Sequence, residues 1–148
     1  MTRRFQNFIN GRSIPPNSND WIDSVNPATG EVWAQIARSN VVDVRLAVES
    51  AKRASEQHDW RYNSANRSKI LHDIADRLDS EHQKLIEIEI NDNGKRIREV
   101  KAQMSGLGDW YRHFAVALAQ MEVENLNLNL DGVSAYLDLI PYGVVGAI

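Results

Sequence analysis

The chain has 148 residues, enough for one ordinary domain, and its 43% apolar and 25% charged residues are close to the average for globular proteins. Its 17 basic and 20 acidic residues are spread along the sequence, which excludes the basic face of a nucleic-acid-binding protein. No apolar run approaches the roughly 20 residues that cross a bilayer, and Arg3-Arg4 is not followed by the apolar stretch of a secretion signal. We therefore expect a soluble, cytoplasmic protein that binds neither nucleic acid nor membrane.

The sequence contains no cysteine, which excludes a disulfide framework, a thiolate metal site and a cysteine nucleophile within these residues. The four histidines are never within four residues of one another, so no local zinc-ligand spacing exists. They are His58, His72, His82 and His113. No Gly-x-Ser-x-Gly elbow, Walker loop or dinucleotide fingerprint is present either. The residues alone therefore predict no catalytic site.

The first 37 residues predict short strands separated by turns. Asn10-Gly11 is typical of a hairpin turn, and the proline- and asparagine-rich stretch 14–20 predicts an exposed loop. Two strands are expected over Trp21–Val25 and Val32–Ala37. In the segment Asn26–Gly30 between them, proline fixes φ early and glycine allows a positive φ later, as a turn requires.

From residue 41 onward, the spacing of apolar residues changes to that of helices. The expected helices cover residues 41–57, 64–79, 80–93 and 97–121, with a break at 59–63. Ser39 or Asn40 is expected to cap the first helix, and Ser64 the second. Ser80 begins a capping-box pattern that predicts the start of the third helix, and Gly94 predicts its end.

The fourth predicted helix carries eight apolar residues at alternating steps of three and four, which predicts a seam buried along its whole length. These residues are Ile97, Val100, Met104, Leu107, Tyr111, Phe114, Leu118 and Met121. Gly106 and Gly108 interrupt the helix and predict either a kink or the close approach of another backbone. We interpret the aromatic cluster Trp110, Tyr111 and Phe114 as part of the core.

Beyond this helix the apolar period becomes two, and Asp131-Gly132 separates two alternating segments, which predicts a β-hairpin with a two-residue turn. The expected apolar face consists of Leu126, Leu128, Leu130, Val133, Ala135, Leu137 and Leu139. The expected polar face consists of Asn127, Asn129, Ser134 and Tyr136. The continuous apolar run Val144–Ile148 is typical of a strand buried in a parallel sheet. A terminal carboxylate there would be costly to desolvate, so we expect the chain to be cut from a longer protein.

Four short motifs lie in order along the chain: Phe8–Gly11, Val25–Val32, Asp92–Lys95 and Pro141–Ile148. Trp60, Arg67 and Ile70-Leu71 fall between them. Together these residues resemble the NAD(P)-dependent aldehyde dehydrogenase family. The resemblance spans essentially the whole chain, and one departure is Arg96, which stands where many members have proline.

The resemblance implies an incomplete α/β fold, the N-terminal part of an aldehyde dehydrogenase, with short strands, four helices, a hairpin and the first strand of a Rossmann-like parallel sheet. Residues 1–125 would be part of the cofactor-binding domain, 126–140 an oligomerisation hairpin that makes a homo-oligomer, and 141–148 the truncated first strand. The family oxidises an aldehyde to a carboxylate with NAD or NADP. Its catalytic cysteine, glutamate base and Pro-Trp-Asn segment have no counterpart here, so we assign no catalytic or cofactor-binding residue and expect the chain alone to be inactive.

The resemblance also implies a structural monovalent cation, for which the matching positions are Ser24, Val25 and Asp92. The alternative is that Asp92 closes a helix end or pairs with Lys95. For function, the alternative is a non-catalytic interaction module or relic that associates with full-length subunits through the 126–140 hairpin.

Overall fold

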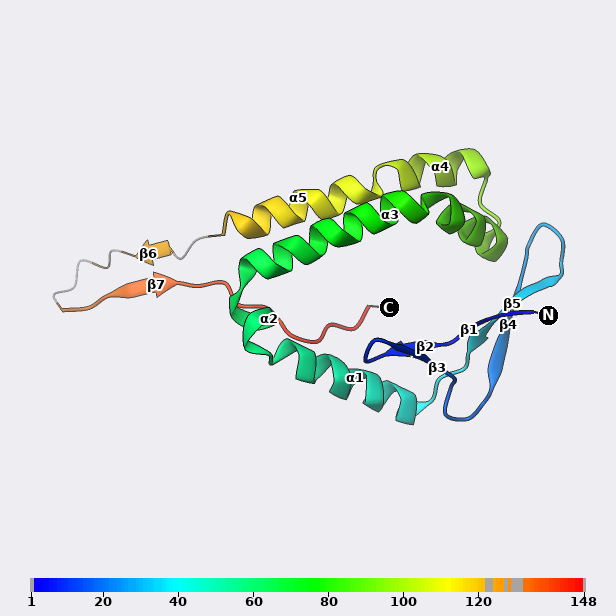
Figure 1. Cartoon of the computed structure of the whole chain (residues 1–148), viewed down its shortest axis with the longest axis horizontal. Coiled ribbons are helices and arrows are strands. Elements are labelled where there is room, and N and C mark those ends of the chain that lie inside the picture. The colour runs from blue at the N-terminus through cyan, green and yellow to red at the C-terminus, as the bar shows by residue number, and fades with distance from the viewer. Residues whose placement is uncertain (1, 122–123, 127, 129–131, 148) are drawn as a thin grey trace.

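The computed structural model describes residues 2–121, 124–126, 128 and 132–147 (Figure 1). The strands are β1 (Arg3–Phe5), β2 (Asn7–Ile9), β3 (Arg12–Ile14), β4 (Trp21–Val25), β5 (Val32–Ala37), β6 (Glu124–Leu126) and β7 (Ala135–Leu137). The helices are α1 (Val41–Ser55), α2 (His58–Tyr62), α3 (Ser64–Asn93), α4 (Ile97–Ser105) and α5 (Leu107–Ala119). In Figure 1, α3 runs alongside α4 and α5, the C-terminal segment passes between this layer and α1, and the hairpin of β6 and β7 projects away from the helices. Within the described ranges, no helix combines the length and apolar character that a membrane crossing requires.

The short strands predicted over the first 37 residues are confirmed, and they form two small sheets. In the larger sheet β5 is central, parallel to β1 and antiparallel to β4. β2 and β3 pair separately through a turn in which Asn10 and Gly11 have φ values of 53° and 73°, as a tight Asn-Gly hairpin turn requires. β4 and β5 match their predicted ranges at every residue, and the turn between them closes when the Asn26 amide donates to the Glu31 carbonyl at 2.9 Å.

The start of α1 is held by a buried carboxylate. Asn40, rather than Ser39, caps the helix, because its side-chain oxygen accepts hydrogen bonds from the amides of Val42 and Asp43. The Asp43 carboxylate accepts a hydrogen bond from the Asn40 amide at 2.9 Å and another from the Asn17 amide at 3.0 Å. Asp43 is only 3% exposed, so this carboxylate ties the loop after β3 to the helix.

The two helices predicted on either side of residue 80 are the single helix α3, and the break predicted at 59–63 is wrong because α2 forms there. Ser80 caps no helix, since its hydroxyl donates to the Arg77 carbonyl at 2.9 Å within α3. The N-cap of α3 is Asn63 rather than Ser64, because the Asn63 side chain accepts a hydrogen bond from a backbone amide of the first turn. The predicted end at Gly94 is confirmed.

The helix predicted over 97–121 is two helices, α4 and α5, which meet at Gly106. Gly106 has φ −105° and ψ 1°, so its backbone leaves the helical conformation. The apolar seam is buried at Val100 but not along its whole length. The interpretation of the aromatic cluster as core is wrong for Trp110 and Phe114, which are 66% and 55% exposed and stack on the surface with ring centroids 6.3 Å apart.

Small residues explain why the aromatic rings stay outside. α5 packs on α3 through Gly108 and Ala115, which are both buried, and the Ser68 hydroxyl of α3 donates to the Ala115 carbonyl. A Cβ atom at Gly108 would lie 2.5 Å from Asp79 Oδ1 and 2.9 Å from Arg112 Nη1. The close approach expected at this glycine is therefore to side chains of an ion pair, not to another backbone.

The predicted hairpin forms, with β6 antiparallel to β7. A two-residue turn at Asp131-Gly132 would place Leu137 opposite Leu126. In the structure the residue opposite Leu126 is Ala135, so the register of the hairpin differs from the predicted one. The shift is by two residues, so Leu126 and Ala135 still share one face of the hairpin. The following residues of the predicted turn and faces lie outside the described residues: Asn127, Asn129, Leu130 and Asp131.

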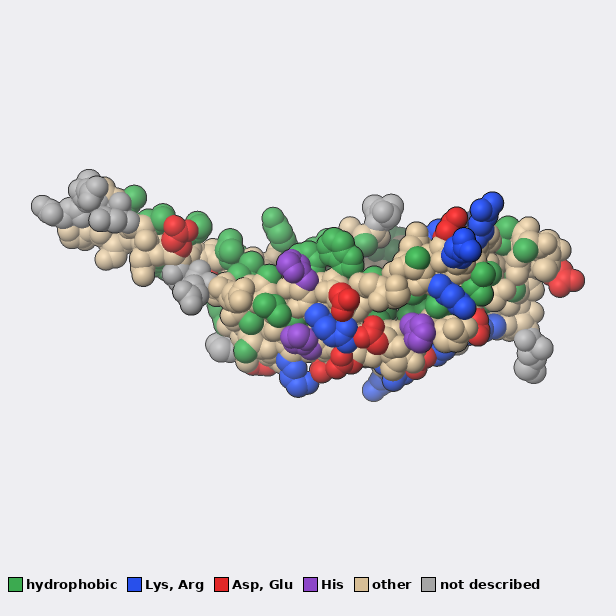
Figure 2. All heavy atoms as spheres, turned by 90° about the horizontal axis from the view of Figure 1, so that it is seen from above, with side chains coloured by type: hydrophobic (Ala, Val, Ile, Leu, Met, Phe, Trp, Pro, Cys, Tyr) green, Lys and Arg blue, Asp and Glu red, His purple; other side chains and the backbone are tan. Residues whose placement is uncertain are grey.

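Apolar side chains are exposed on the hairpin near the C-terminus and also on the helices, as Figure 2 shows. In the hairpin region they are Leu126, Leu128, Val133, Leu137, Leu139 and Ile140. Residues 141–147 form no strand, in contrast to the prediction over 141–148, and Ile148 lies outside the described residues. A parallel strand needs a partner strand to pair with, and the segment instead passes α1, where a Cβ at Gly143 would lie 3.8 Å from Ser55 Oγ.

Candidate functional site

Ser24 and Asp92, two of the residues that the resemblance assigns to a cation, are 68 positions apart in sequence and meet in the structure. The Ser24 hydroxyl, near the end of β4, donates a 2.6 Å hydrogen bond to Asp92 Oδ1 in the last turn of α3. Trp33 Nε1 on β5 donates to the same Ser24 oxygen at 2.8 Å. The Ser24 hydroxyl thus accepts a hydrogen bond from the indole through one of its lone pairs and donates its single proton to the carboxylate.

The turn between β4 and β5 rests on the end of α3. Asn26 Nδ2 donates to Asn91 Oδ1 at 3.0 Å. Gly94 ends the helix in the left-handed conformation, with φ 70°, and a Cβ there would lie 3.1 Å from Pro27 Cβ. Two of the motifs that carry the family resemblance, one in the turn and one at the helix end, are therefore packed against each other.

Val25, the third assigned residue, lies at an irregularity in the sheet. The register of β4 against β5 shifts between Ser24 and Val25. A bulge of this kind takes backbone groups out of the regular ladder. The oxygen groups that meet here, the Asp92 carboxylate and the Ser24 hydroxyl, have the chemistry that hard cations prefer.

The two alternative roles of Asp92, closing the helix end and pairing with Lys95, are filled by neighbouring residues. Lys95 Nζ donates to Glu89 Oε1 at 2.7 Å, and Asn93 Nδ2 donates to the same oxygen at 2.7 Å. These two hydrogen bonds, that from Lys95 first, lower the pKa of Glu89 below its usual value. The helix is closed by Gly94, so Asp92 neither forms the cap nor pairs with Lys95.

No second constellation with metal-binding chemistry stands out. Among the described residues, no group of three or more histidine, aspartate or glutamate side chains is placed to hold a metal ion. His82 Nδ1 lies 2.9 Å from the Asp79 carbonyl, and the His113 ring contacts Phe114 edge-on with centroids 5.4 Å apart. The imidazoles of His82 and His113 thus interact with protein groups of their own helices.

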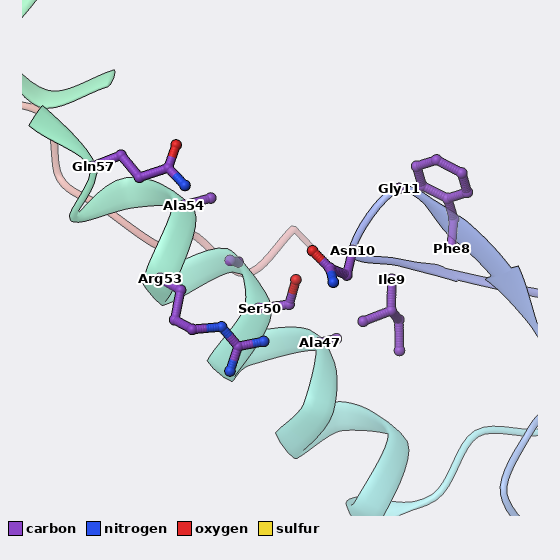
Figure 3. A pocket seen from close by; sticks show the side chains of 10 residues that line it. Phe8, Ile9, Asn10, Gly11, Ala47, Ser50, Arg53, Ala54 and Gln57 are labelled. Atoms are coloured by element: carbon purple, nitrogen blue, oxygen red, sulfur yellow. The ribbon is translucent and has the colours of Figure 1, made fainter. Parts of the chain in front are cut away.

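A groove of about 490 Å³ separates the β2–β3 hairpin from α1 (Figure 3). Figure 3 shows Asn10 at the hairpin tip directed toward Ser50 of α1, with Arg53 farther along the helix. The α1 side of the groove is lined by small residues, among them Ala47 and Ala54. The sequence did not predict this groove because its two walls, around Asn10 and Ser50, are 40 positions apart. The small-residue face of α1 and the Asn-Gly turn were each recognisable in the sequence.

Comparison with known proteins agrees with the resemblance read from the motifs. The family model described as "Aldehyde dehydrogenase family" matches residues 14–148. The chain is 38% identical over 148 residues to an aldehyde dehydrogenase of Deinococcus radiodurans, covering 99% of this chain and 28% of the relative. It is 32% identical to (Z)-2-((N-methylformamido)methylene)-5-hydroxybutyrolactone dehydrogenase of Acinetobacter baylyi, covering 99% and 30% of the two chains. The chain thus spans less than a third of the length of these relatives.

Solved structures show the same fold. An NAD-dependent aldehyde dehydrogenase from Sinorhizobium meliloti superposes with a TM-score of 0.82 at 27% identity, covering 88% of this chain and 26% of that one. Betaine aldehyde dehydrogenase from Staphylococcus aureus, in complex with NAD+, gives a TM-score of 0.82 at 23% identity, covering 87% and 26%. The helices and N-terminal sheets are thus those of the N-terminal part of this fold, and the chain belongs to the aldehyde dehydrogenase family.

Proposed function

We propose that these residues are part of a cytoplasmic enzyme that oxidises an aldehyde to a carboxylate with NAD or NADP. Within it, residues 1–125 contribute to the cofactor-binding domain, 126–140 to assembly and 141–148 to the first strand of a Rossmann-like sheet. The observation that supports this most directly is the packing of the Asn26–Gly30 turn on the Asp92–Lys95 helix end. These two segments carry the family resemblance and are distant in sequence, yet they fit together.

The proposed reaction turns one aldehyde and one water into a carboxylate, and passes a hydride to the nicotinamide with release of two protons. NAD or NADP supplies the hydride acceptor when bound. The sequence contains no cysteine, so a thiolate nucleophile would have to come from outside these 148 residues. The described residues contribute structure, because their contacts hold the β4–β5 turn against the end of α3.

The test compares the 148-residue chain with the same residues inside a longer protein. We expect the purified chain, mixed with NAD+ or NADP+ and a panel of aldehydes, to give no cofactor reduction above background. A protein that continues after Ile148 into the rest of the family's sequence should reduce the cofactor. Turnover by the 148-residue chain would overturn the proposal that it lacks the catalytic residues.

The cation proposal adds a role for Ser24, Val25 and Asp92. It is supported by the 2.6 Å contact between the Ser24 hydroxyl and the Asp92 carboxylate, and by the bulge beside it. We expect sodium or potassium to raise the melting temperature of the longer protein relative to a bulky organic cation at equal ionic strength. The Asp92→Ala variant should lose this difference, whereas Asp109→Ala, at an exposed carboxylate on α5, should keep it. An unchanged difference in Asp92→Ala would contradict the proposal.

A second candidate is a non-catalytic module that binds full-length subunits, and the exposed apolar face of the hairpin favours it. Leu128 is 51% exposed, and the neighbouring apolar side chains of the hairpin are uncovered as well. Mixing the tagged 148-residue chain with an active family member, followed by affinity capture and an assay, separates the two candidates. Co-capture with altered activity would support the module, and recovery of the tagged chain alone would count against it.

A further inference from the structure

We propose that Asn10 is a site of spontaneous deamidation, whereas Asn93 is protected from the same reaction by the fold. These are the two asparagines of the sequence that are followed by glycine, and in both cases a basic residue comes next, Arg12 or Lys95. The two sites therefore have similar intrinsic reactivity, and their surroundings decide which one reacts.

In the reaction, the backbone nitrogen of the following glycine attacks the side-chain carbonyl carbon of asparagine. A carbon–nitrogen bond forms, the bond to the side-chain amide nitrogen breaks, and ammonia leaves. Water then opens the cyclic imide at either carbonyl to give aspartate or isoaspartate. Solvent water is the only co-reactant, and a glycine favours the attack because it has no Cβ to obstruct the imide.

Asn10 is open to this reaction. It is exposed at the tip of the β2–β3 hairpin, and nothing lies within 4 Å of the position of a Cβ on Gly11. Within the described part of the chain, no hydrogen bond involves the Asn10 side chain. β2 and β3 are three residues each and form a sheet of their own, so local opening of the turn costs little free energy.

Asn93 is held at each group that the reaction must move. Its side-chain nitrogen donates to Glu89 Oε1 at 2.7 Å, and its side-chain oxygen accepts from the Lys95 amide at 2.9 Å. The nucleophile itself, the Gly94 amide, donates to the Ile90 carbonyl at 3.0 Å. Cyclisation at Asn93 would have to break these bonds at the end of α3.

The modification changes the charge of a defined surface. It replaces a neutral amide by a carboxylate and lowers the formal net charge from −3 by one. Asn10 lines the groove against α1, and Arg53 lines the same groove (Figure 3). The new carboxylate therefore arises on the same groove as the Arg53 guanidinium, a charge of opposite sign.

The test uses the full-length gene product, incubated folded in mildly alkaline buffer and, in parallel, unfolded in guanidinium. Proteolysis and mass spectrometry of the two Asn-Gly peptides give the conversion at each site over time. We expect Asn10 to convert at least about tenfold faster than Asn93 in the folded protein, a ratio equivalent to about 1.4 kcal/mol of opening free energy. In guanidinium the two rates should become similar.

Two variants serve as controls. Asn10→Gln should abolish the conversion of the first peptide without changing the second, and Asn93→Gln should do the reverse. Equal rates at the two sites in the folded protein, faster conversion at Asn93, or no conversion at Asn10 during a period in which the unfolded chain reacts would each overturn the proposal. A ratio that persists in guanidinium would also overturn it, because sequence rather than fold would then set the rates.

Discussion

The Ser68 hydroxyl donates a 2.7 Å hydrogen bond to the carbonyl oxygen of Ala115, and both residues are buried between α3 and α5. Replacing Ser68 by alanine removes this link between helices, and we expect the free energy of unfolding to fall by about 1 kcal/mol. Urea unfolding followed by circular dichroism measures the change. Ser80→Ala is the matched control, because the Ser80 hydroxyl bonds within its own helix at an exposed position. Equal losses in the two variants would contradict a special role for the buried hydrogen bond.

The two glycines of the α4–α5 region should respond to alanine in opposite directions. At Gly108 the new Cβ displaces the Asp79 carboxylate, which accepts a 2.6 Å contact from Arg112 Nη2, so stability should fall. At Gly106 nothing lies within 4 Å of a new Cβ and φ is −105°, so alanine should stabilise by about 0.4–1 kcal/mol through the unfolded chain. Melting temperatures of the two variants decide the matter, and shifts of the same sign would refute this account.

Gly94 and Gly30 have nearly the same backbone conformation but different neighbours. Their φ values are 70° and 72°, so alanine costs about 1–2 kcal/mol of left-handed strain at either position. Only at Gly94 does the new Cβ also meet Pro27, at 3.1 Å. We therefore expect Gly94→Ala to destabilise more than Gly30→Ala in urea unfolding. Similar losses would mean that the contact between the turn and α3 contributes nothing.

Acid should weaken the end of α3 through Glu89. Hydrogen bonds from Lys95 and then Asn93 lower the pKa of Glu89, so it is lower in the folded than in the unfolded chain. The resulting stabilisation is present above the usual glutamate pKa of about 4.3 and is lost as the pH falls through the folded value. Glu89→Gln should reduce the loss of stability between neutral pH and this acidic range. Glu49→Gln, at an exposed position of α1, is the matched control for the loss of one carboxylate.

We propose, from the family resemblance, that the hairpin acts in subunit assembly. Leu128→Asp would bury an unpaired charge at a subunit contact, at a cost of several kcal/mol, and should lower the oligomer content of the longer protein. Asn129→Asp, on the expected polar face but outside the described residues, should be nearly silent. Asn125→Asp is a control among the described residues, since Asn125 pairs with Tyr136 and so has the opposite orientation to Leu126. Equal oligomer content of all three variants in size-exclusion chromatography would show that the hairpin is not part of the interface.

Local signals in the sequence predicted the N-terminal strands and turns well. The bounds of β4 and β5 and the Asn10-Gly11 turn follow from residues adjacent in sequence, so no distant contact was needed to infer them. The prediction of a helix start at Ser80 was wrong because a serine hydroxyl can bond backward within a helix as readily as it caps one. Sequence spacing does not distinguish these two outcomes.

The exposure of Trp110 and Phe114 and the meeting of Ser24 with Asp92 both depend on how distant segments pack. Periodicity marks an apolar face but does not show which partner covers it, and α5 uses its small residues against α3 instead. For Ser24 and Asp92 the residues themselves carried no signal of proximity. The family resemblance supplied that pair, and the 2.6 Å contact agrees with it.

The hydrogen bond from Trp33 to Ser24 makes the same region observable by fluorescence. The emission of an indole depends on the groups around it, and this one donates to the oxygen that contacts Asp92, with the Phe5 ring edge-on at 5.8 Å. A rearrangement of the Ser24 hydroxyl therefore changes the surroundings of Trp33 directly. The sequence has three other tryptophans, so the difference spectrum against a Trp33→Phe variant would isolate this signal. The protein carries its own optical probe at the junction of β4, β5 and α3.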